Sequence, residues 1–239
     1  MKQFKFFSAI TLVAGSLFFS SCNGDEKKTD NVTVSTDSSA VNKTEPPAKP
    51  GNLVIIKHKV ANFAKWKTAY ESHDSTRLAY GLHNYIVARG LKDSNMVMVV
   101  LKMDDTTKAK QFAALPDLKA AMQKGGVMGA PSFLYLDVQM LDTSANAPTR
   151  VIVTHKVKDW DAWKKSFDSH KQTRLDAGMT DRAISYSVGD THTVTVAFVI
   201  NDMKKAEAFM ASKDLKDKMA ESGVVGPPDI FFYNVVQKY

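Results

Sequence analysis

The stretch that decides the fold is HKVANFAKWKTAYESHDSTRLAYG, residues 58–81, because the chain repeats it as HKVKDWDAWKKSFDSHKQTRLDAG at residues 155–178. A constant offset of 97 positions relates the two copies, from His58 to His155 and from Gly126 to Gly223. The match needs no gap over residues 54–138 and 151–235. A repeat of this length is much longer than a solenoid unit, so it indicates a duplicated domain.

Hydrophobic periodicity and capping residues predict the same elements in each copy. In the first copy we expect a strand over 53–60, then a helix that Asn62 caps and Gly81 ends. Two further strands follow, over 85–91 and 95–103. After them we expect a helix capped by Asp105, a short helix from Asp117 and a closing strand over 132–140. Asp202 is the corresponding cap in the second copy. The order is β-α-β-β-α-β, the ferredoxin-like plan.

The fold class is therefore α+β, with two tandem ferredoxin-like repeats packed as an intramolecular pseudo-dimeric α/β barrel. The motifs HKV, W, H, R and GVxGxP stand in this order in both copies, and the second copy also has AG before GVxGxP, at Ala177 and Gly178. In this the chain resembles the dimeric α/β-barrel superfamily, and more narrowly its small antibiotic-biosynthesis-monooxygenase and "cyclase"-like proteins. The resemblance implies that a homodimer has been fused into one polypeptide, so we expect a monomeric pseudo-dimer.

The start of the chain has the pattern of an export signal. Lys2 and Lys5 precede an apolar run over residues 6–19, which is shorter than the roughly 20 residues of a spanning helix. The following LFFSSC resembles the lipobox of bacterial lipoproteins, and Cys22 is the only cysteine of the chain. We expect lipidation at Cys22 and attachment to the cell envelope, at a periplasmic or surface face of the outer membrane. An ordinary signal peptide with a chance cysteine and an uncleaved anchor are the alternatives.

The sequence divides into five predicted segments. Residues 1–21 are the lipoprotein signal peptide, and residues 22–52 are the lipidated cysteine with a polar tether that is too poor in apolar residues to fold. Residues 53–140 are the first repeat, 141–149 a linker and 150–239 the second repeat.

The chain is basic, with a formal net charge of +7 and a pI near 9.3. Most lysines stand beside acidic residues in predicted helices, which is typical of a solvated face; contact with anionic lipid headgroups or an acidic ligand is the alternative. No basic stripe interleaved with aromatic residues is present in the sequence, so nucleic acid is not an expected partner.

The candidate site follows from the direction of the side chains. Strand alternation points His58 at the helices, together with the apolar face of Val97, Val99, Leu101 and Met103. Helical spacing places Trp66, His73 and Arg77 on the inward stripe of the first helix. We therefore expect a ligand cleft between sheet and helices in each copy. Its candidate residues are His58, Trp66, His73 and Arg77, and in the second copy His155, Trp163, His170 and Arg174.

Each candidate also has a structural alternative. His58 and His155 can be core residues, Trp66 and Trp163 packing residues, and each arginine either an anion ligand or a cover for helix carbonyls. No carboxylate or cysteine completes a metal-ligand set at a recognisable spacing, so no metal site is predicted.

Two functions remain open at this point. The first is an envelope lipoprotein that binds a small, partly apolar or acidic molecule. The second, implied by the resemblance, is a cofactor-independent monooxygenase, a cyclase or a haem-handling enzyme with histidine as acid or base. The sequence names no cofactor. It does show that the copies differ, since HNYIVAR at 83–89 becomes TDRAISY at 180–186, and Met96 and Met98 become Thr193 and Thr195.

Overall fold

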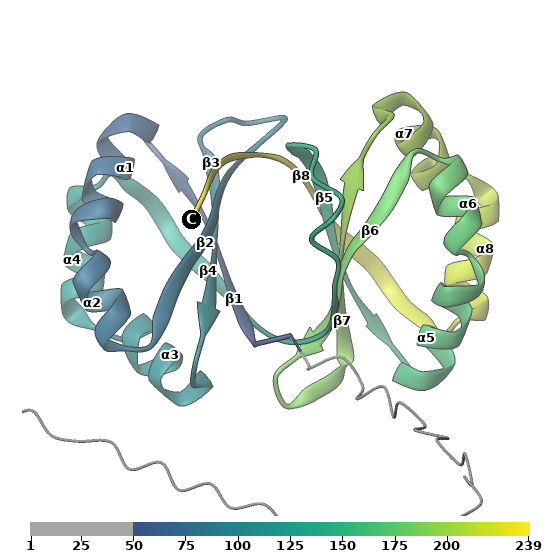
Figure 1. The fold of residues 1–239 in the computed structure, drawn as a ribbon, viewed down its shortest axis with the longest axis horizontal. Coiled ribbons are helices and arrows are strands. Elements are labelled where there is room, and N and C mark those ends of the chain that lie inside the picture. The colour runs from purple at the N-terminus through teal and green to yellow at the C-terminus, as the bar shows by residue number, and fades with distance from the viewer. Residues whose placement is uncertain (1–49) are drawn as a thin grey trace, which may run out of the picture. The chain divides into compact units, whose positions relative to one another are not determined.

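The computed structural model describes residues 50–239. The predicted signal peptide, Cys22 and nearly all of the predicted tether lie outside these residues. The described part is a closed antiparallel barrel of eight strands, with the helices of each repeat on the outer side of its own sheet (Figure 1). None of the described helices has the length and apolar character needed to cross a bilayer.

The elements of the first repeat follow the predicted order, with each helical region divided in two. They are β1 (Leu53–Val60), α1 (Phe63–Ser72), α2 (Asp74–Ala79), β2 (Leu82–Gly90), β3 (Met96–Met103), α3 (Thr106–Ala113), α4 (Pro116–Lys124) and β4 (Val127–Leu141).

The second repeat has the same elements at the same offset. They are β5 (Thr149–Val157), α5 (Trp160–Ser169), α6 (Lys171–Asp176), β6 (Met179–Ser187), β7 (Asp190–Ile200), α7 (Met203–Ala211), α8 (Lys213–Glu221) and β8 (Val224–Lys238).

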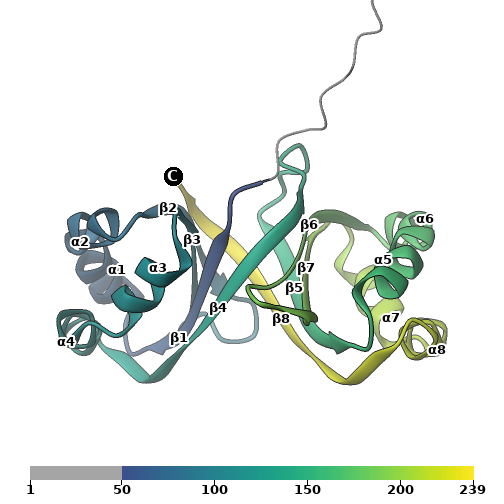
Figure 2. The ribbon, with the colours of Figure 1, turned by 90° about the horizontal axis from the view of Figure 1, so that it is seen from below.

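Two equivalent junctions close the barrel. The strand order is β1-β3-β2-β8-β5-β7-β6-β4, so β2 pairs with β8 and β4 pairs with β6 across the repeats. At one junction Gly90 is the register partner of Tyr233, and at the other Ser187 is the partner of Leu136, the same two positions at the repeat offset. Figure 2 shows the long strands β4 and β8 crossing at the middle of the molecule, between the two repeats. The repeats are thus related by a pseudo-twofold axis.

Strand alternation divides the apolar side chains into separate cores. On the outer face of each sheet, β-strand side chains pack against the helices, around Trp66 in the first repeat and Trp163 in the second. The inner faces of both sheets form a third core inside the barrel, lined by Leu53, Ile55, Ile86, Ala88, Met98, Val100, Leu136, Val138, Ile152 and Tyr233. The predicted direction of His58 and of the Val97 face toward the helices is confirmed.

The single helix predicted between residues 62 and 81 is wrong, because the structure breaks it at His73. In an unbroken helix the carbonyl of Tyr70 would accept the amide of Asp74. Here that carbonyl accepts the amide of His73 at 3.3 Å and the Arg77 guanidinium at 2.7 Å. The second repeat breaks at His170 in the same manner, with Arg174 donating to the carbonyl of Phe167 at 2.6 Å.

The caps predicted at Asn62, Asp105 and Asp202 are confirmed, since each side chain accepts the amide three residues later. The closing strands begin earlier than predicted. They include the Gly-rich stretches, where Gly129 and Gly226 have positive φ of 73° and 72°. Glycine adopts this conformation without a Cβ clash, so the strand bends there and continues.

Candidate functional site

Each repeat encloses a cleft between its sheet and its helices, and the predicted candidates line both. His58, Trp66, His73 and Arg77 surround the first cleft, and His155, Trp163, His170 and Arg174 the second. The first cleft has a volume of about 50 Å³ and the second about 130 Å³. The structure therefore brings all eight side chains to the predicted places, and it makes the two clefts unequal.

The strand histidine of each cleft is buried without a hydrogen bond. His155 is 7% exposed, and within residues 50–239 neither of its ring nitrogens has a partner. Its ring lies 5.5 Å from that of Trp163. Burial lowers the pKa of His155 to about 4, so the ring is neutral at pH 7. His58 has the same surroundings against Trp66, and burial also lowers its pKa to about 4.

A neutral imidazole has one N–H donor and one acceptor nitrogen. Leaving a buried polar group without a partner costs about 1–3 kcal/mol. In the second cleft this cost falls on a ring that is part of the cleft lining, with both nitrogens buried. A molecule that binds there with one hydrogen-bonding group would satisfy His155.

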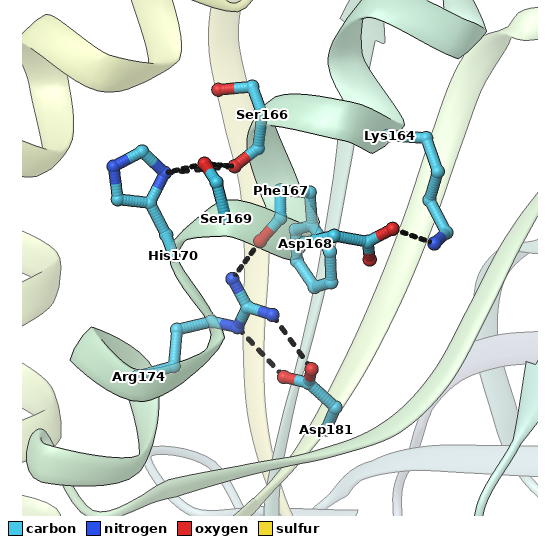
Figure 3. A network of polar contacts seen from close by, with 8 residues as sticks. All are labelled: Lys164, Ser166, Phe167, Asp168, Ser169, His170, Arg174 and Asp181. Atoms are coloured by element: carbon cyan, nitrogen blue, oxygen red, sulfur yellow. Dashed lines mark hydrogen bonds and ion pairs between the residues drawn. The ribbon is translucent and has the colours of Figure 1, made fainter.

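The helix histidine of the second cleft is oriented by its own backbone (Figure 3). Nδ1 of His170 lies 2.9 Å from the carbonyl oxygen of Ser166. A carbonyl only accepts, so Nδ1 carries the proton in this contact, and in the neutral ring the lone pair is then on Nε2. In the first repeat Nδ1 of His73 has no partner among the described residues, and burial together with the Arg77 charge lowers the pKa of His73.

The arginines are held inside the fold. Both oxygens of Asp181 accept from Arg174, at 2.8 Å from Nε and 2.7 Å from Nη2, and the guanidinium stacks on Phe167 at 3.6 Å (Figure 3). Arg77 donates to Asp74 at 3.0 Å and stacks on Tyr70 at 3.8 Å. Of the two roles that the sequence left open, the contact with helix carbonyls is the one present, and the fork of Arg174 is filled by the protein's own carboxylate.

The difference in cleft size has a local cause where the helices meet. In the first repeat Gly125 packs on Ala69, and a Cβ added at Gly125 would lie only 3.1 Å from that methyl group. The equivalent residues in the second repeat are Ser222 and Ser166, which both line the larger cleft. Consistent with this spacing, Leu118 of α4 is buried, whereas no side chain of α8 is buried. The two serines thus stand where Ala69 and Gly125 bring α1 and α4 together in the first repeat, and they line the larger cleft.

The walls of the second cleft are mainly apolar. Besides the candidates they comprise Val153, Phe167, Met179, Val196, Phe198, Phe209, Met210, Leu215, Met219, Pro228 and Ile230, with Asp214 and Lys218 also present. Lys218 pairs with Glu221 at 2.8 Å. Our sequence reasoning missed Ser166 and Ser222, although the replacement of Ala69 and Gly125 at the repeat offset was a visible signal. Residues 50–239 contain no cluster of three or more histidine, cysteine, aspartate or glutamate side chains that could hold a metal ion.

Comparison with solved structures identifies the architecture. At a TM-score of 0.52 and 16% identity, the chain is similar to a candidate monooxygenase from Fusobacterium nucleatum, over 78% of this chain and 92% of that one. The chain has the dimeric α/β-barrel fold. An anthrone oxidase-like protein (TM-score 0.52, 14% identity, 79% and 92% covered) and a candidate chlorite dismutase (0.52, 15%, 79% and 96%) share it.

These similarities establish the fold and leave the activity open, because one fold hosts many chemistries. No protein-family model matches the chain, and no curated protein matches it either. The function must therefore be argued from the clefts themselves.

Proposed function

We propose that the protein binds a small, mainly apolar molecule in the cleft of the second repeat, where His155 makes one hydrogen bond to it. The observation that carries this proposal is a buried, neutral His155 with no partner among residues 50–239, in the lining of an apolar cleft. Its nitrogens are buried, so the ring must turn or the neighbouring side chains must shift slightly for the hydrogen bond to form. Apolar walls with few polar groups are typical of small-molecule sites.

The volume limits the ligand. The cleft volume of about 130 Å³ is close to the roughly 150 Å³ of a cavity that takes up benzene, so it fits one ring, and a second fused ring can extend toward the cleft mouth. Because Asp181 neutralises Arg174, a neutral or weakly polar molecule fits better than a strong acid. A haem macrocycle exceeds this volume and would require α8 to move outward.

Indole is a suitable probe, since it combines two fused apolar rings with one N–H donor. We expect calorimetry to give one indole site per chain with a negative heat-capacity change. His155→Leu should weaken binding about tenfold or more, whereas the matched His58→Leu in the first repeat should leave it unchanged. Equal effects of the two substitutions, or none from either, would argue against the second cleft.

A second candidate function is acid–base catalysis on the bound molecule. The observation that favours it is His170, whose Nδ1 contact with the Ser166 carbonyl leaves Nε2 as an acceptor at the cleft. An oriented imidazole of this kind is a general base. Under this alternative His170→Gln abolishes turnover of a bound compound while its affinity changes little; under simple binding no compound is turned over by the wild-type protein.

We further propose that Cys22 is lipidated and holds the domain at the cell envelope. The signal-like segment and the lone cysteine support this. Labelled palmitate should enter the wild-type protein and not Cys22→Ser; labelling of neither would exclude the anchor.

A further inference from the structure

The interior of the barrel contains a cluster of four polar side chains that line neither of the two clefts. It consists of Tyr85, Arg150, Arg182 and Tyr233, and all four line a cavity of about 50 Å³ inside the barrel. Arg150 is only 3% exposed and Arg182 only 7%. The remaining walls of this barrel cavity are mostly apolar, including Ile55, Met98, Val100 and Ile152.

The Arg182 guanidinium keeps an unused donor, and both guanidiniums contact only neutral groups. Arg182 donates from Nη2 to the hydroxyl of Tyr85 at 2.7 Å, but its Nη1 is buried with no partner among the described residues. Arg150 donates from Nε to the carbonyl of Ala147 at 3.3 Å. Tyr233, its register partner on β8, lies beside it. These hydroxyl and carbonyl partners accept hydrogen bonds from the guanidiniums of Arg150 and Arg182, but they are neutral and do not compensate the two positive charges.

No salt bridge joins either arginine to a carboxylate of residues 50–239, in contrast to Arg174 with Asp181. One carboxylate, that of Asp142, interacts electrostatically with Arg182, and none interacts in this way with Arg150 among the described residues. Buried charges in proteins are ordinarily paired, because an isolated charge loses its hydration without compensation. Arginine stays protonated even when buried. Burial of Arg150 lowers its pKa, and the nearby Arg182 charge acts in the same direction, so the two cations disfavour each other. The barrel cavity therefore has an excess of positive charge.

This polar cluster exists because the repeats have diverged. Tyr85 and Arg182 are equivalent residues at the repeat offset, each at a register shift in its strand, and they meet across the pseudo-twofold axis. Leu53 is the equivalent of Arg150, and Leu136 the equivalent of Tyr233. A true homodimer would place two arginines or two tyrosines on the axis, whereas the fused chain places one of each.

We propose that the barrel cavity binds a small oxoanion, held between the Arg150 and Arg182 guanidiniums with the Tyr85 and Tyr233 hydroxyls beside it. A volume of about 50 Å³ is several times the roughly 10–15 Å³ that a single water requires, so it leaves room for a small ion such as phosphate or for the carboxylate end of a short organic acid. Paired guanidinium donors suit both geometries.

The test uses the full-length chain in detergent, in a chloride buffer free of oxoanions. Phosphate, sulfate, acetate and butyrate are titrated at constant ionic strength, with calorimetry and thermal unfolding as readouts. We expect saturable binding of at least one of them at one site per chain and a rise in Tm that follows its concentration. Binding of phosphate or sulfate alone identifies an inorganic anion, and binding of the carboxylates alone an organic acid.

Matched variants replace each arginine by the residue that stands at its position in the first repeat. Arg150→Leu and Arg182→Tyr should each weaken anion binding about tenfold or more while unfolding without the anion at a Tm no lower than that of the wild type. Arg89→Leu is the control, since Arg89 contacts Ser94 and Phe63 outside the barrel cavity, and it should keep the anion response. The proposal is overturned if no oxoanion binds or raises the Tm more than the same concentration of chloride does. It is also overturned if both barrel-cavity variants bind the oxoanion as tightly as the wild type. The proposal is also overturned if both variants unfold at a lower Tm than the wild type in the oxoanion-free buffer while no oxoanion raises the Tm of the wild type.

Discussion

Single residues give the fold its clearest measurable property, which is the burial of neutral histidines. His58 and His155 have folded-state pKa values of about 4, against an ordinary value of 6.5. Between these values the unfolded chain binds more protons than the folded one, so acid favours unfolding. Most of this pH range lies above the pKa values of ordinary carboxylates, so the histidines can be distinguished from them.

We expect the free energy of unfolding to fall as the pH decreases from about 6.5 to about 4, by up to about 3 kcal/mol for each histidine. Urea unfolding across this pH range measures it. The double substitution His58→Leu with His155→Leu should flatten the profile. A wild-type profile that is already flat would show that these rings are solvated.

Residue-level reasoning from the sequence placed the histidines correctly, because strand alternation fixes the direction of a side chain. It could not settle the arginines. Arg174 contacts Asp181 of β6, and the approach of α6 to that strand is a tertiary fact that local spacing does not contain.

Removing the partner of Arg174 should be costly, because Arg174 is buried. We expect Asp181→Ala to lower the free energy of unfolding by about 3 kcal/mol. Asp181→Asn, which installs the residue found at Asn84 in the first repeat, should cost less since one acceptor remains. Urea unfolding of both variants is the measurement, and equal stability of Asp181→Ala and wild type would refute a structural role.

At the level of elements, the break between α1 and α2 explains both a failure and a success of the sequence reasoning. Periodicity predicted one helix because the inward stripe continues through His73 to Arg77 across the break. The arginine that lies on this stripe also donates to the carbonyl of Tyr70 at the end of α1, next to the His73 amide. The candidate residues therefore line one cleft even though the predicted element was wrong.

The spacing between α5 and α8 sets the capacity of the second cleft. We expect the double substitution Ser166→Ala with Ser222→Gly to let α8 approach α5, as α4 approaches α1, and to weaken indole binding about tenfold. The reciprocal Ala69→Ser with Gly125→Ser should open the first cleft and create a second indole site. Calorimetry reports both, and unchanged affinity and stoichiometry in the two variants would show that the serines do not control the cleft.

At the scale of the whole molecule, the gapless repeat predicted the barrel, and the closed strand order agrees with it. The barrel cavity was not predicted. Tyr85 and Arg182 are 97 residues apart and become neighbours only when the two sheets join around the axis. Divergence of the HNYIVAR and TDRAISY stretches signalled that the copies differ, but not that the differing residues meet.

A closed barrel has no free strand edge, so we expect the full-length protein to be monomeric in detergent at all practical concentrations. A chain of residues 50–141 exposes the edges of β2 and β4, and we expect it to dimerise or aggregate. Analytical ultracentrifugation separates these cases. A dimer of the full-length protein that dissociates on dilution would contradict the pseudo-dimer.

The central claim is that the second cleft holds a small molecule and the first does not. Native mass spectrometry of the full-length protein from its own host tests it most directly, with Ser166→Ala/Ser222→Gly expressed alongside. The account predicts that each wild-type chain carries a cleft molecule that is absent from the double variant and retained in Arg150→Leu, whereas an oxoanion in the barrel cavity would be retained in the double variant and lost from Arg150→Leu. A wild-type chain that carries no adduct, or whose every adduct persists equally in the double variant, would contradict it.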